Sequence, residues 1–185
     1  MNLRKKGFSL LMMIMLLAGL SLSAACDEGN GNEIPPTTTE PIPETTYPLN
    51  IVDQLGRTIA IESEPQRIIS LAPSNTEIIY ALGLQERLIG VTTYCNYPEA
   101  ALDKPKVGGF STADVELITE AEPDLIIAGN IHAGKVIPQL EELGFTVLAL
   151  SPDNLDEVLE AITITGEATN VNKQTHDLVE DLRSR

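Results

Sequence analysis

The chain has 185 residues and a formal net charge of −15 at pH 7, because it carries 27 acidic and only 12 basic side chains. A surface this acidic repels phosphate backbones and anionic lipid headgroups, so nucleic acid is not an expected partner. The two cysteines and two histidines lie far apart in the sequence and are too few for an ordinary zinc site.

The first 25 residues have the layout of a secretory signal peptide. Basic residues (4–6) precede an apolar stretch (8–22), and small residues lead to Cys26. A cysteine in this place resembles a bacterial lipoprotein box, although Ser23 stands where the box usually has leucine. Because the apolar stretch is short for a spanning helix of about 20 residues, we expect lipidation of Cys26 rather than a retained signal anchor. Either outcome places the rest of the chain outside the cytoplasmic membrane, in a periplasm or at a cell surface.

Residues 26–48 have the composition of a tether. Beyond Cys26 they are mostly Asp, Glu, Gly, Asn, Pro and Thr, and they contain few apolar side chains. Such a stretch cannot bury enough apolar surface to fold, so we expect it to be flexible and partly extended. The folded part is then expected to begin near residue 49.

The folded part predicts an α/β fold. Two short extended segments, 49–53 and 58–61, lie on either side of Gly56 and predict a hairpin. The predicted strands that follow are 68–71, 88–91, 125–128 and 146–150, and the predicted helices are 75–82, 113–121, 135–143, 155–167 and 173–185. Continuous apolar strands are typical of a parallel sheet covered on both faces. We therefore expect a Rossmann-like lobe with a mostly parallel sheet covered by helices.

Three helix starts carry a capping pattern, in which a polar residue precedes an acid by three places. The pairs are Ser74–Glu77, Ser111–Asp114 and Asn154–Glu157. Each start follows an extended run, so all three should gather at the carboxyl edge of the sheet. Ligands bind at this edge in open α/β sheets.

Three polar residues favour ordinary structural roles. We expect Cys95 to be a small, half-buried packing residue and His176 to face solvent. His132 follows the strand 125–128, and we expect an exposed loop residue there rather than a metal or ligand contact. The common motifs of nucleophilic, zinc-dependent and phosphate-binding catalysis are missing, so we expect no enzymatic activity.

Four motifs recur in the order of a known family: PSNTE (73–77), TYCNYP (93–98), VGGF (107–110) and DVE (114–116). With them, residues 49–185 resemble the N-terminal lobe of the class III periplasmic binding proteins. These proteins deliver cobalamin, ferric siderophores and haem to ATP-driven importers, and the motifs are most similar to those of the cobalamin-binding branch. The resemblance implies a substrate-binding lipoprotein without a cofactor of its own. It would capture a corrinoid or an iron chelate and pass it to an ABC importer permease.

The resemblance also implies the residues of the site. Ser74 and Asn75 lie in a loop that meets the ligand in the cobalamin branch, Tyr94 is a ligand contact, and Phe110 packs on the ligand. Glu116 matches a glutamate that pairs with a permease arginine. The aromatic residues lie in loops of an aromatic-poor chain, where they suit a flat apolar ligand. Packing alone would also explain them, and the helix dipole would explain an acid at position 116.

The family implies two lobes joined by a long helix. Residues 49–170 would form the N-terminal lobe, residues 171–185 would begin the interlobe helix, and the second lobe would be absent, as in a fragment or a truncated gene product. Corrinoid, haem and siderophore all remain open as ligands. Two other functions also remain: a surface docking or sensory module without a ligand, or a remnant of such a receptor. An extracytoplasmic enzyme is disfavoured by the missing acid, base and nucleophile.

Overall fold

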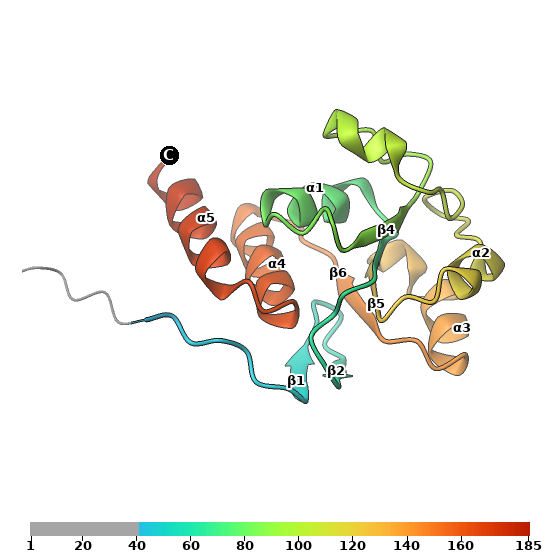
Figure 1. Ribbon diagram of the computed structural model, residues 1–185, viewed down its shortest axis with the longest axis horizontal. Helices are drawn as coiled ribbons and strands as arrows, with labels where there is room; N and C mark the ends of the chain where they lie inside the picture. Colours follow the sequence, from blue (N-terminus) through green and yellow to red (C-terminus); the bar gives the residue numbers. More distant parts are fainter. Residues whose placement is uncertain (1–40) are drawn as a thin grey trace, which may run out of the picture. The chain divides into compact units, whose positions relative to one another are not determined.

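A parallel sheet of four strands forms the centre of the lobe in the computed structural model, which describes residues 41–185 (Figure 1). The strands are β3 (Ile68–Ser70), β4 (Leu88–Val91), β5 (Leu125–Gly129) and β6 (Val147–Leu150). They lie in the order β4-β3-β5-β6, and every neighbouring pair is parallel. The predicted α/β class and Rossmann-like sheet are confirmed. The expected signal peptide, Cys26 and the first part of the expected tether lie outside the described residues.

The described part of the chain also contains five α-helices and two short 3-10 helices. They are α1 (Pro73–Ala81), η1 (Glu99–Asp103), α2 (Val115–Glu120), η2 (Asn130–His132), α3 (Val136–Glu142), α4 (Leu155–Ala168) and α5 (Asn172–Ser184). Each predicted helix is present, with ends that differ by at most two residues.

The two faces of the sheet have separate cores. Along β5, Leu125 and Ile127 pack in a core with residues of α1 and α4, whereas Ile126 and Ala128 pack in a second core with residues of α2 and α3. Successive side chains of a strand point to opposite faces, so a strand covered on both faces must be apolar throughout. This explains why the strand residues form continuous apolar runs in the sequence.

Only one of the three predicted capping patterns is confirmed. Asn154 accepts a hydrogen bond from the backbone N–H of Glu157 and donates its amide to the Glu157 carboxylate. At α1 the pattern at Ser74 is wrong, because Pro73 already occupies the first turn, where its missing N–H costs nothing. At α2 the cap is Asp114 itself, which accepts from the backbone N–H groups of residues 116 and 117.

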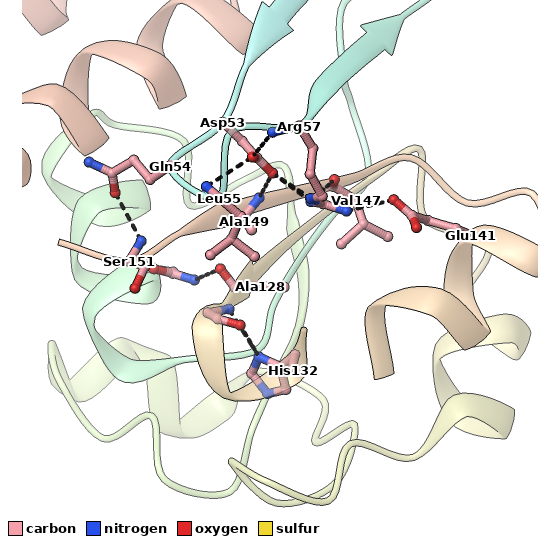
Figure 2. A network of polar contacts seen from close by, with 12 residues as sticks. Asp53, Gln54, Leu55, Arg57, Ala128, His132, Glu141, Val147, Ala149 and Ser151 are labelled. Atoms are coloured by element: carbon pink, nitrogen blue, oxygen red, sulfur yellow. Dashed lines mark hydrogen bonds and ion pairs between the residues drawn. The ribbon is translucent and has the colours of Figure 1, made fainter. Parts of the chain in front are cut away.

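The predicted hairpin is confirmed: β1 (Leu49–Val52) pairs antiparallel with β2 (Thr58–Ile61). Its loop is attached to β6 through Asp53, whose side chain is fully buried (Figure 2). The Asp53 carboxylate accepts hydrogen bonds from the Arg57 guanidinium, from backbone N–H groups of its own loop and from the backbone N–H of Ala149. Arg57 also donates to the Val147 carbonyl at 2.9 Å. The hairpin loop thereby satisfies backbone groups at the free edge of β6.

The last residues of the expected tether are not flexible in the structure. The Thr45 N–H donates to the Asn170 side chain at 2.7 Å, and the Tyr47 hydroxyl donates to the Ala168 carbonyl at 3.0 Å. Burial raises the pKa of Tyr47 to about 12. The prediction of a tether up to residue 48 is therefore wrong at its C-terminal end. The polar composition of this segment gives no sign of its order, because the order comes from hydrogen bonds to the connection between α4 and α5.

Glu64 joins the same connection to the start of β4. It accepts from the Asn170 amide at 3.2 Å and pairs with Arg87 at 2.7 Å. The hydrogen bond from Asn170, followed by the Arg87 charge, holds the pKa of Glu64 below its usual value of 4.5.

A lowered folded-state pKa stabilises the fold above pH 4.5, and this contribution disappears as the pH falls below that value. We expect Glu64→Gln to lower the urea midpoint at pH 7, and we expect its difference from the parent to shrink as the pH falls below 4.5. A difference that does not shrink on acidification would contradict this assignment.

No helix within residues 41–185 is both long enough and apolar enough to cross a bilayer.

Candidate functional site

The loops that follow β3, β4, β5 and β6 leave the sheet at its carboxyl edge, because all four strands run in the same direction (Figure 1). Four of the five expected contact residues lie in or near these loops: Ser74, Asn75, Tyr94 and Phe110. The fold thus brings residues from distant parts of the sequence to one edge, where open α/β sheets bind ligands.

The segments that carry Tyr94 and Phe110 lie side by side. The Thr93 N–H donates to the Gly108 carbonyl at 2.9 Å. A side chain at Gly109 would place its Cβ 3.8 Å from Cε2 of Tyr94, so the tyrosine ring lies beside the backbone that precedes Phe110. Tyr94 is 64% exposed and Phe110 is half-buried. An apolar ligand at this edge would meet both rings.

Gly108 is required for the turn that presents Phe110. Its φ of +102° lies in the region that favours glycine, and a Cβ there would lie 2.6 Å from the Asp114 backbone nitrogen. The backbone N–H of Asp114 donates to the Val107 carbonyl at 2.9 Å and closes the base of the segment. The Gly-Gly pair of the VGGF motif therefore serves a tight turn at the site.

His132 lies beneath the Phe110 segment and is fully buried, so the prediction of an exposed loop residue is wrong. The 3-10 turn η2 folds the imidazole back under the end of β5 (Figure 2). There Nδ1 accepts from the Gly129 N–H at 2.9 Å and lies 3.2 Å from the Gly129 carbonyl oxygen, the contact drawn in the figure. Nε2 lies 2.6 Å from the Phe110 carbonyl oxygen, and the two rings meet edge to face at 5.8 Å. A lone histidine in a loop gives no sequence signal for such an arrangement.

The two neighbours on α1 have different roles. Ser74 is exposed in the first turn. Asn75 is only 2% exposed, and its amide donates to the carbonyls of Ile127 and Ala128 at 3.3 and 3.1 Å. The Asn75 side chain therefore fastens α1 to the end of β5, which leaves Ser74 as the solvent-facing side chain of this expected pair.

Sequence reasoning missed two exposed apolar residues at the same edge. Ile131, in the turn after β5, is 54% exposed, and Leu155, at the start of α4 after β6, is 71% exposed. Both are large apolar side chains that face solvent, in or near the loops that leave the carboxyl ends of β5 and β6. The available signal was a single apolar residue between polar or small residues soon after the end of a buried strand.

Glu116 lies in the first turn of α2, and its side chain is exposed. Leu117 beside it is 41% exposed. Among the ion pairs of residues 41–185, none involves Glu116, so its carboxylate is free to meet a basic partner.

Cys95 is fully buried rather than half-buried, which corrects the prediction. The Thr76 hydroxyl donates to its sulfur at 3.1 Å, and the Thr92 hydroxyl lies at 3.3 Å. The thiol helps to join the β4 loop to α1. In the described part of the chain, no group of three or more His, Cys, Asp or Glu side chains is arranged to hold a metal ion.

Comparison with known proteins gave a family match and several relatives. The family model described as "Periplasmic binding protein" matches residues 68–185. An uncharacterized ABC transporter substrate-binding lipoprotein of Bacillus subtilis, YvrC, is 35% identical over 172 residues, which are 90% of this chain and 54% of YvrC.

Two solved structures show the same fold over part of their length. The periplasmic vitamin B12 binding protein BtuF of Vibrio cholerae has a TM-score of 0.59 and 36% identity, over 65% of this chain and 48% of BtuF. A periplasmic heme binding protein from Pseudomonas aeruginosa has a TM-score of 0.62 and 29% identity, over 65% of this chain and 44% of that protein. The chain thus spans about half the length of the relatives that it matches. These relatives are binding proteins, in agreement with the expectation that the chain is not an enzyme.

Proposed function

The chain belongs to the periplasmic binding protein family, and we propose that it forms the N-terminal lobe of the substrate-binding protein of an ABC importer. In this role the carboxyl edge of the sheet would contact a corrinoid or an iron chelate outside the membrane. The observation that carries the proposal is the grouping of exposed Tyr94, half-buried Phe110 and exposed Ile131 at that edge. Helix α5 would begin the connection to a second lobe, which would supply the remaining ligand contacts.

The charge of the edge favours a corrinoid over haem or a ferric siderophore. The loop segments at this edge are 71–75, 92–97, 107–113, 129–135 and 151–154, and Lys135 is their single lysine or arginine. Lys104 and Lys106, which lie nearby in sequence, donate to backbone carbonyls at 2.7 and 2.9 Å. Haem propionates and the anionic groups of many ferric siderophores require cationic partners, whereas the side chains of cobalamin are mostly neutral amides.

We expect Phe110→Ala to weaken ligand binding about tenfold, because a stacked aromatic ring at the centre of a site contributes much of its binding energy. Equilibrium dialysis of the full chain against cyanocobalamin, hemin and a ferric catecholate, read from the absorbance of each probe, measures the effect. The affinity of Phe145→Ala, measured in the same way, controls for the loss of an aromatic residue elsewhere, since Phe145 packs with the core beside α3. Equal affinity of the parent and Phe110→Ala for the bound probe would contradict the stacking role. Failure of all three probes to bind would contradict ligand binding by this lobe.

A second surface, around Glu116 on α2, is proposed to meet the permease. We expect Glu116→Lys to leave the affinity for the bound probe unchanged and to abolish most transport, because a like charge would face the permease arginine. Uptake of labelled cobalamin in cells that depend on this importer measures the effect. Glu120→Lys, one turn further along α2, is the matched control. If Glu116→Lys weakens ligand binding as well, the residue has a structural role and this assignment fails.

The proposal includes an anchor at the extracytoplasmic face of the membrane. The signal-like residues 1–25 and the small residues before Cys26 support lipidation of that cysteine, with the residues up to about 41 as the tether. Metabolic labelling with a fatty acid should mark the parent and leave Cys26→Ser unmarked. Equal labelling of both proteins would exclude Cys26 as the acceptor.

A further inference from the structure

We infer that His132 is a positioning residue for the ligand edge: its neutral ring, protonated at Nε2, fixes the Phe110 segment to the end of β5. The consequence for ligand binding rests on the proposed function. The positioning itself is a property of the free chain and can be tested without a ligand.

The hydrogen bonds determine which ring nitrogen carries the proton. The Gly129 N–H donates to Nδ1 at 2.9 Å, so Nδ1 must present a lone pair. Nε2 lies 2.6 Å from the Phe110 carbonyl oxygen, which can only accept, so Nε2 must donate. In the other tautomer Nδ1 would donate to the Gly129 carbonyl at 3.2 Å, but two lone pairs would then face each other at 2.6 Å. The Nε2–H form satisfies both of the shorter contacts.

The Phe110 segment depends on this bond at its tip. The base of the segment is held by backbone hydrogen bonds from Thr93 to Gly108, from Gly109 to Thr112 and from Asp114 to Val107. Within residues 41–185, the backbone of Phe110 has one hydrogen bond, the one from His132. The edge-to-face contact of the two rings at 5.8 Å adds a preferred orientation to this single attachment. Loss of the imidazole donor should therefore free the tip and leave the base in place.

The same turn also presents Ile131. Within η2, His132 is fully buried and contacts Phe110, while the preceding residue, Ile131, is 54% exposed and faces solvent. His132 thus sets the position of one apolar side chain from a turn that itself carries another. The positioning role gives a reason for a buried polar ring in the turn that follows β5.

Nitrogen spectra of the parent chain test the tautomer directly. The chain has two histidines, and His176 is exposed on α5, so it serves as the internal reference. Long-range proton–nitrogen correlation at neutral pH should show His132 with a protonated Nε2 and an unprotonated Nδ1, and His176 with averaged signals. A protonated Nδ1 on His132 at that pH would overturn the inference.

Two variants separate the hydrogen bond from His132 to the Phe110 carbonyl from the hydrogen bond between the Gly129 N–H and His132. Glutamine places its amide N–H where Nε2 lies, so His132→Gln can still donate to Phe110. Asparagine places its oxygen where Nδ1 lies, so His132→Asn keeps the Gly129 contact and loses the Phe110 contact. With fluorinated phenylalanine, Phe110→Leu identifies the Phe110 signal among the few phenylalanine signals of the chain. We expect this signal to shift and sharpen in His132→Asn and to stay near the parent position in His132→Gln.

Dialysis against cyanocobalamin then links position to binding. We expect about a tenfold loss of affinity in His132→Asn and less than a threefold loss in His132→Gln. An unchanged Phe110 signal in His132→Asn would overturn the positioning role, whatever the affinity. If the parent binds no cyanocobalamin, the proposed corrinoid ligand fails, and the fluorine and nitrogen signals still decide the role of His132.

Discussion

Replacing Asp53 with alanine is expected to lower the free energy of unfolding by about 3–5 kcal/mol, the usual effect of removing one partner of a buried ion pair. The Asp53 carboxylate has no exposed surface, and its partner Arg57 is only 26% exposed. The carboxylate accepts from the Arg57 guanidinium and also from the backbone N–H groups of Leu55, Arg57 and Ala149. Alanine would leave all of these donors without their acceptor.

The cost would extend beyond the hairpin, because the same loop covers the edge of β6. The Gln54 N–H donates to the Ala149 carbonyl at 3.1 Å, and its side chain accepts from the Ser151 N–H at 2.9 Å (Figure 2). When Asp53 no longer fixes the loop, these bonds become harder to form, and the edge of a parallel sheet opens to water. The loop after β6, which lies at the proposed ligand edge, would then lose order.

Urea unfolding followed by circular dichroism at pH 7 measures this effect. Glu141→Gln is the matched control, since Glu141 binds the other side of the same guanidinium at 2.6 Å but is 44% exposed. We expect that variant to lose less than about 1 kcal/mol, as is typical of exposed pairs. Similar losses in Asp53→Ala and Glu141→Gln would contradict a special role for the buried carboxylate.

The sequence predicted the layers of this fold better than the contacts at their edges. Strands buried on both faces must be apolar at every position, so the runs at 68–71 and 125–128 revealed both the strands and the parallel sheet. The hairpin was predictable because Gly56, with a φ of +74°, marks its turn. Asp53 appeared only as a turn residue, since nothing in the local sequence states that Ala149 would donate to it.

The sequence predicted only part of the candidate site, and the missing part has a physical explanation. Tyr94 and Phe110 were predicted from motifs. Their segments both belong to the connection between β4 and α2, and they meet in the structure because the Thr93 N–H donates to the Gly108 carbonyl. The Asn75 amide is buried against a carbonyl of β5 that lies 53 residues away in the sequence. The His132 ring is buried because a tight turn folds it back onto Gly129, the last residue of β5. Such side-chain to backbone contacts have no periodic signature, so only the folded chain reveals them.

Gly166→Ala is expected to destabilise the lobe by about 1–3 kcal/mol, against the direction that helix propensity predicts. In an exposed helix this change would add up to about 1 kcal/mol of stability. Gly166 lies in α4, however, where α5 crosses it closely. A Cβ at Gly166 would lie 2.7 Å from the Cβ of Thr175, 2.9 Å from its Cγ2 and nearer still to its hydroxyl oxygen.

Thr175 cannot move aside without loss, because it is 5% exposed and its hydroxyl donates to the Val171 carbonyl at 2.9 Å. The two helices would have to separate, and α5 would change its direction relative to the lobe. Thermal unfolding of Gly166→Ala, alone and with Thr175→Ala, measures the effect, and the second change should restore part of the stability. Gly134→Ala, where a Cβ meets no atom within 4 Å, should change stability little. Stabilisation by Gly166→Ala would mean that α4 and α5 lie further apart, and α5 would then be a poor guide for placing a second lobe.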